Sequence, residues 1–185
     1  MRLLMLPLLS LLLSACATPP APTAVLRPET VVAVTDRAEL IRFNAGQPGR
    51  ITARLPLLGL PAGETLVGID FRVARGVLYA VSSRGQLYTL NTESARLTRV
   101  GDAAPLALQG SRFGVDFNPA ADRVRVVSDQ GQNLRLHPDT GAVAATDPAL
   151  AYAPDDVAAG RSPQVSAAGY TYNPQDSKIT TNYAI

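Results

Sequence analysis

The stretch LVGIDF at Leu66–Phe71 recurs as RFGVDF at Arg112–Phe117, 46 residues further along the chain. The same shift carries LYAVS at Leu78–Ser82 onto VRVVS at Val124–Ser128. An identical offset in separate segments indicates an internal repeat. A period of about 40–50 residues is typical of folds that use one supersecondary unit per repeat.

Each repeat contains four short segments with the composition of β-strands. Their apolar residues are often β-branched or aromatic, or they alternate with polar residues, and polar turns at 83–85 and 91–94 separate them. The strands expected within one repeat are Leu66–Arg72, Gly76–Ser82, Gln86–Leu90 and Arg96–Val100. Four antiparallel strands per repeat predict an all-β fold with β-propeller-like blades. The alternative is an open β-meander or a sandwich.

The phase of the repeat predicts about three and a half blades. The chain opens with the last three strands of a unit, at 31–34, 40–43 and 51–55, and two full units follow. A last unit begins at Gly169 and ends within its second strand. Because propellers usually have at least about four blades, we expect a truncated chain or a ring that stays open. An open blade leaves backbone N–H and C=O groups unpaired, which predicts self-association through its edge.

The N-terminus has the layout of a secretory signal. Arg2 is followed by an apolar run, Leu3–Leu13, which is too short to span a bilayer as a helix. The run ends in Leu-Ser-Ala-Cys at 13–16, which resembles the lipobox of bacterial lipoproteins. The resemblance implies a diacylglyceryl thioether on Cys16, and the non-acidic Ala17 implies sorting to the outer membrane. The alternative is an ordinary secreted or periplasmic protein cut after Ala15 or Ala17.

The expected organisation has three parts: a signal peptide at 1–15, a proline-rich tether at 16–30 and the β-repeat domain at 31–185. Prolines in the tether fix φ and remove backbone donors, so this stretch is expected to run extended. Cys16 is the only cysteine of the chain, which excludes an intrachain disulfide.

Composition narrows the classes of function. The formal net charge is +2, and no basic stripe interleaved with aromatic residues is present, so nucleic acid is not an expected partner. The single histidine excludes a histidine-based metal site with several imidazole ligands. No cofactor and no metal are expected.

Two segments carry a family resemblance. FGVDFNPAADRVRVVSDQGQNLRLHPDTG at Phe113–Gly141, together with LYAVSSRGQLYTLNT at Leu78–Thr92, is similar to a bacterial family of exported proteins known as domain of unknown function 4394. The resemblance covers about residues 30–185. It implies a propeller-like repeat domain and implies no activity.

The repeat brings forward one pair of candidate ligand-binding residues. Asp70 and Asp116 are equivalent in the repeat and fall on the strand expected to be innermost, where side chains can line a central channel. The alternative is structural, with each carboxylate accepting hydrogen bonds from turn backbone or from Arg72, Arg123 or Arg125. Asn118, which precedes a proline, is expected to start a turn.

The largest insertion between repeats is a second candidate. The loop at 144–163 carries Asp155 and Asp156 and is rich in proline, alanine and aspartate. Loops of this length are uncommon unless they are functional or disordered. We therefore expect it to contribute a binding surface.

The sequence favours a non-catalytic, lipid-anchored envelope protein whose β-repeat domain binds a protein or a small ligand. The reason is a repeat scaffold without a catalytic set of residues. One alternative is a hydrolase or lactonase-like propeller with a calcium-type metal held by Asp70, Asp116 and Asn118. Another is a partial gene product without independent activity.

Overall fold

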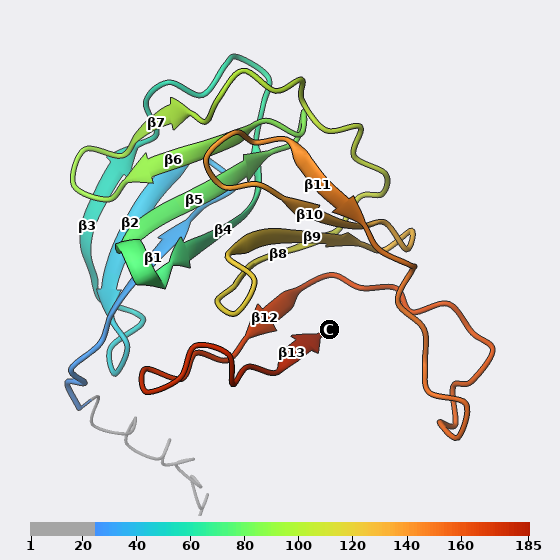
Figure 1. Ribbon diagram of the computed structural model, residues 1–185. Coiled ribbons are helices and arrows are strands. Elements are labelled where there is room, and N and C mark those ends of the chain that lie inside the picture. The colour runs from blue at the N-terminus through green and yellow to red at the C-terminus, as the bar shows by residue number, and fades with distance from the viewer. Residues whose placement is uncertain (1–24) are drawn as a thin grey trace, which may run out of the picture.

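The computed structural model describes residues 25–185, which form an all-β structure of four antiparallel sheets (Figure 1). The predicted signal peptide and Cys16 lie outside the described residues. The first sheet has three strands: β1 (Thr30–Val34), β2 (Glu39–Asn44) and β3 (Ile51–Pro56). These strands agree to within two residues with the partial unit expected at the start of the chain.

The second and third sheets are the two complete units. The second contains β4 (Leu66–Arg72), β5 (Val77–Ser82), β6 (Leu87–Asn91) and β7 (Arg96–Arg99), with the short 3-10 helix η1 (Val73–Arg75) between its first two strands. The third contains β8 (Phe113–Asn118), β9 (Arg123–Ser128), β10 (Asn133–Leu136) and β11 (Val143–Thr146). In both sheets the strands pair in sequence order. The predicted propeller-like, four-stranded antiparallel blade is confirmed.

The repeat is preserved in the strand register. Asp70 pairs with Tyr79 between β4 and β5, and Asp116 pairs with Arg125 at the equivalent place between β8 and β9. The last sheet has two strands, β12 (Ala168–Tyr170) and β13 (Asn182–Ala184). A single repeat unit thus accounts for the strand order of the sheets.

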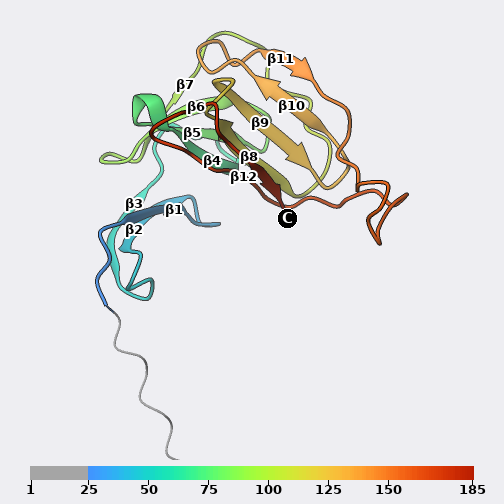
Figure 2. The ribbon, with the colours of Figure 1, turned by 60° about the horizontal axis from the view of Figure 1, so that its bottom comes forward.

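The first strands of successive sheets lie side by side. β8 contacts both β4 and β12, and Figure 2 shows β12 alongside β8 while the β1–β3 sheet stands apart from them. Glycines make this approach close: a Cβ on Gly114 would lie 2.5 Å from the backbone N of Ala168, and one on Gly68 would overlap the side chain of Val115. Glycine at this position of the repeat therefore lets neighbouring inner strands touch.

Two apolar clusters hold neighbouring sheets together. One joins the second and third sheets and includes Val81, Leu87, Val126 and Leu136, all almost completely buried. The other joins the first and second sheets around Leu40. Burying each such side chain stabilises the fold by about 1.5–3 kcal/mol. Each cluster lies between sheets, so a sheet is stabilised by its neighbours.

The insertion differs slightly from its expected bounds. β11 extends to Thr146, and the loop then runs to β12 at Ala168. Within residues 25–185 the structure contains no helix of the length and hydropathy needed to cross a membrane.

Candidate functional site

A cavity of about 360 Å³ lies where β4, β8 and β12 come together. Its polar lining comes mainly from the carboxylates of Asp70, Asp116 and Asp122 and from Arg72. Four rings make up its aromatic lining: Phe71, Phe117, Tyr170 and Tyr172. Since three inner strands contribute, the site depends on the packing of neighbouring sheets and is not contained in one repeat.

The two repeat-equivalent aspartates each bridge to the next inner strand. Asp70 Oδ2 accepts a hydrogen bond from the backbone N–H of Phe117 at 2.8 Å. Asp116 Oδ2 accepts one from the backbone N–H of Tyr170. Each carboxylate thus accepts a hydrogen bond from a strand amide of the next sheet, instead of from a turn amide or an arginine.

The same two side chains also meet each other. Burial, a hydrogen bond to Asp70 and the negative charge of Asp70 together raise the pKa of Asp116 to about 8, although the amides of Tyr170 and Phe117 act in the opposite direction. Two carboxyls this close cannot readily both be ionised. The raised pKa therefore favours the protonated form of Asp116 at neutral pH.

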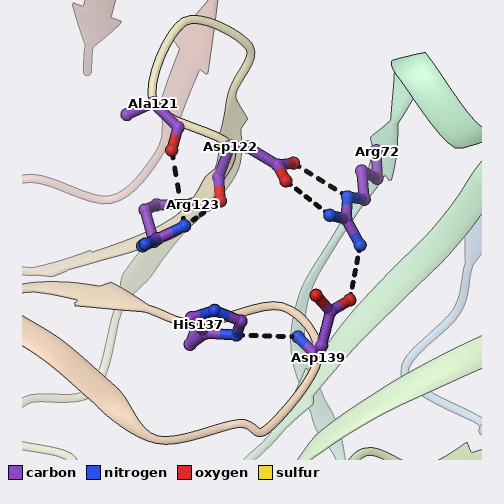
Figure 3. A network of polar contacts seen from close by, with 6 residues as sticks. All are labelled: Arg72, Ala121, Asp122, Arg123, His137 and Asp139. Atoms are coloured by element: carbon purple, nitrogen blue, oxygen red, sulfur yellow. Dashed lines mark hydrogen bonds and ion pairs between the residues drawn. The ribbon is translucent and has the colours of Figure 1, made fainter.

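Arg72, at the end of β4, clamps two turns of the third sheet (Figure 3). Its Nε donates to Asp122 Oδ1 at 2.8 Å, its Nη2 pairs with the second oxygen of Asp122, and its Nη1 donates to Asp139 Oδ1 at 2.7 Å. The guanidinium also lies 5.8 Å from the centroid of the Phe117 ring. Because the residue is only 6% exposed, this is a buried charge with two acidic partners.

The turns that receive Arg72 are themselves fixed by local hydrogen bonds. Asp122 has a positive φ of 50°, and its carbonyl oxygen accepts a hydrogen bond from Arg123 at 2.8 Å. Asp139 donates its N–H to His137 Nδ1 at 3.2 Å. The hydrogen bond that Arg72 donates lowers the pKa of Asp139, and the hydrogen bonds that Arg72 donates to Asp122 and Asp139 raise the pKa of Arg72. Arg72 and Asp139 therefore stabilise each other's charged forms.

A second arginine, Arg125, packs against Tyr170, one of the aromatic residues that line the cavity. The Arg125 guanidinium is 6.0 Å from the centroid of the Tyr170 ring, and its Nη2 donates to Asp147 at 3.2 Å. Asp147 also receives two hydrogen bonds from Arg135, at 2.7 and 2.8 Å. The ring of Tyr170 thus packs against the guanidinium of Arg125, whose charge is balanced by Asp147.

The other predicted site residues lie outside the cavity lining. Asn118 Oδ1 accepts hydrogen bonds from the N–H groups of Ala120 and Ala121, at 2.9 and 3.0 Å, as a turn-starting residue does. Asp155 and Asp156 are exposed in the insertion, where Asp156 Oδ1 accepts a hydrogen bond from the N–H of Ala158 at 2.7 Å. Asn118 is therefore engaged in its own turn, apart from the aspartate pair.

Sequence reasoning missed Arg72 and Asp122 as cavity residues. The signal that could have found Arg72 is its departure from the repeat, because the equivalent position holds Asn118. The part of the chain that the structure describes contains no group of three or more His, Cys, Asp or Glu residues suited to hold a metal ion.

The described chain is a protein of propeller-like antiparallel sheets with a cavity at the junction of its inner strands. It belongs to the family described as Domain of unknown function (DUF4394), which matches residues 39–185. The family resemblance seen in the sequence is thereby confirmed. No curated protein is similar to the chain in sequence.

One similar solved structure is described as BBS1N in complex with ARL6DN, soaked with mercury. It shares 14% sequence identity with this chain, with a TM-score of 0.44, over 83% of this chain and 46% of that one. The chain thus spans about half of that structure.

Proposed function

We propose that this protein is a lipid-anchored, non-catalytic binding protein of the bacterial cell envelope, and that its ligand is a small organic cation. The observation that carries the proposal is the pairing of Asp70 and Asp116 in a cavity lined by aromatic rings. Within residues 25–185, neither carboxyl has an arginine or lysine among its hydrogen-bond partners, which are the amides of Phe117 and Tyr170 and the other carboxyl of the pair.

The charge of the cavity supports a cation. Arg72 is the cationic residue of the lining, and its charge is already matched by Asp122 and Asp139. The aspartate pair is therefore the unmatched charge. Aromatic faces attract cations, most strongly where water is excluded, and the rings of Tyr170 and Tyr172 border the same space. An ammonium group could replace the proton that the two carboxyls share.

The envelope location is supported by the N-terminal sequence. A single arginine, an apolar run of signal-peptide length and a lipobox ending at Cys16 occur in that order. The acyl chains on Cys16 would hold the β-repeat domain at the outer membrane, on its periplasmic side, with residues 16–30 as a spacer. If Cys16→Ser still fractionates with membranes, the lipid anchor on Cys16 is wrong.

The cation site is tested by thermal unfolding of the purified chain with butylammonium chloride or calcium chloride, at matched ionic strength and pH 8. We expect butylammonium to raise the unfolding temperature of the parent protein and of Asp155→Asn, whose carboxylate lies outside the cavity. Asp70→Asn is expected to lose the effect. An equal response of Asp70→Asn would refute the site. A response to calcium alone, at stoichiometric concentration, would favour the alternative of a metal-dependent hydrolase.

A further inference from the structure

The first and the last sheet of the described chain contain different strands of the repeat, and each has what the other lacks. Within residues 25–185, the β1–β3 sheet corresponds to strands two to four of a repeat, and no inner strand pairs with the free side of β1. The β12–β13 sheet supplies the inner strand and the second strand of a repeat. One end therefore lacks the strand type that the other end carries.

The free edge of β1 has backbone groups available for pairing. Glu29 and Thr35, which flank the strand, bond to the β2 side through Ala45 and Glu39. Because alternate residues of an antiparallel strand bond to opposite sides, Val32 and Val34 direct their N–H and C=O groups away from β2. In the complete second sheet, the equivalent β5 residues face the inner strand β4.

Two equivalent phenylalanines show that the outer side of β4 is open. Phe117, on β8, is 6% exposed because Tyr79 and Arg72 of the preceding sheet cover it. Phe71 holds the same position on β4 and is 37% exposed. The difference arises because no inner strand of the described chain lies on that side of β4.

The glycines show that the outer side of β12 is open as well. Added Cβ atoms on Gly68 and Gly114 would collide with the next inner strand, whereas one on Gly169 would meet nothing within 4 Å among the described residues. β12 therefore presents a surface shaped for another inner strand.

We propose that two copies of this chain close into one ring, in which β12 of each copy becomes the inner strand of the β1–β3 sheet of the other. β1 takes the place of β13, a strand that pairs over three residues, all of them in exposed positions. Gly169 then lies against β4 of the partner, as Gly68 lies against β8. The arrangement is a two-fold symmetric dimer with two identical junctions.

Strand pairing favours a second copy over closure within one chain. Among the described residues, β12 pairs with β13 and packs against β8, whereas β1 pairs with β2. The free edge of β1 is therefore not covered by β12 of its own chain.

The repeat gives the register of the new junction. Gly68 pairs with Val81 and Asp70 with Tyr79, and the shifts within the repeat place Thr171 of one copy opposite Val32 of the other. Residues bonded across such a pair have Cα atoms about 5.5 Å apart, within the range of about 4.4–6.8 Å that a disulfide spans. Thr171→Cys combined with Val32→Cys therefore reports the junction.

The experiment uses the full chain carrying Cys16→Ser, so that only the introduced thiols can react. We expect sedimentation to give about twice the monomer mass of 19.5 kDa, and oxidation of the double-cysteine variant to give a covalent dimer that neither single variant forms. A concentration-independent monomer, a crosslink within one chain, or an open polymer without a closed dimer would each overturn the proposal.

A glycine variant separates a failure to dimerise from a failure to fold. Gly169→Val adds its side chain into open space in the single chain, but it would collide with β4 of the partner. We expect it to remain folded by circular dichroism and to weaken dimerisation at least tenfold. Gly49→Val, whose Cβ also meets nothing within 4 Å in the described chain, is the matched control and should dimerise normally. Equal dimerisation of the two variants would refute the junction between β12 and β4.

Discussion

The junction of β4 with β8 and the junction of β8 with β12 are built on the same backbone plan but with different side chains. In each, an inner-strand aspartate accepts a backbone N–H from the next inner strand. At the first junction, Tyr79 packs on Phe117 with ring centroids 5.3 Å apart. At the second, Arg125 takes the position of Tyr79 and lies over Tyr170. The hydrogen bond to an aspartate recurs, but its donor Tyr170 lies two residues before Tyr172, the repeat equivalent of Phe117, so the second junction is shifted by two residues relative to the first.

The junctions also differ in how they are locked. Arg72 ties the end of β4 to two turns of the third sheet, whereas the equivalent Asn118 ends β8 and accepts hydrogen bonds within its own turn. The fourth sheet pairs over three residues. The β4–β8 junction is therefore expected to be more stable than the β8–β12 junction. The cavity lies between the two, so its β12 side is the more easily displaced.

Removing the clamp should have the largest effect. Arg72→Met leaves Asp122 and Asp139 without their cation, and breaking a buried ion pair typically costs about 3–5 kcal/mol. Both aspartates are partly exposed, so we expect a loss at the lower end of that range, about 3 kcal/mol, in the free energy of unfolding. Urea denaturation measures it, and a loss below that of Arg54→Met, at an exposed ion pair, would contradict the assignment.

Filling the glycine contact at the second junction should come next. A Cβ on Gly114 meets backbone atoms of Ala167 and Ala168, which cannot turn aside as a flexible side chain would. Overpacking of this kind costs about 1–3 kcal/mol, so we expect Gly114→Ala to destabilise the protein by about 2 kcal/mol in urea denaturation. Gly49→Ala is the control, and a similar loss there would show that the contact is not the cause.

Replacing the arginine of the second junction should cost less than replacing that of the first. Arg125→Met keeps an apolar side chain under Tyr170, and Asp147 still has Arg135 as a partner. The change also removes a buried Nε that lacks a hydrogen-bond partner within residues 25–185. We expect a loss of about 1 kcal/mol, measured as for Arg72→Met. An equal or larger loss would reverse the ranking of the two junctions.

The sequence predicted the blades because the signals for them are local and repeated. Glycine and aspartate recur at fixed spacing, and strand composition alternates with turns, so the sheets and the pair of Asp70 and Asp116 followed from the repeat. Arg72 was missed because its partners, Asp122 and Asp139, lie 50 and 67 residues away in a different sheet. Such a contact depends on how sheets pack, which the period does not specify.

The pH dependence of stability is the effect most specific to the aspartate pair. A carboxyl whose pKa rises on folding binds a proton in the folded state, so its contribution to stability falls as pH rises from its unfolded value of about 3.9 towards the folded value of about 8 for Asp116.

One proton limits this slope to about 1.4 kcal/mol per pH unit, and the partial exposure of the pair reduces it further. The pKa values of Asp139 and Asp147 are lowered by their arginines, so their contribution to the stability of the protein is lost only at acid pH. Urea denaturation between pH 5 and pH 8 therefore isolates the aspartate pair. We expect Asp116→Asn to flatten the fall in stability across this window and Asp155→Asn to leave it unchanged. A parent protein that gains stability over the same window would show that the two carboxyls do not share a proton.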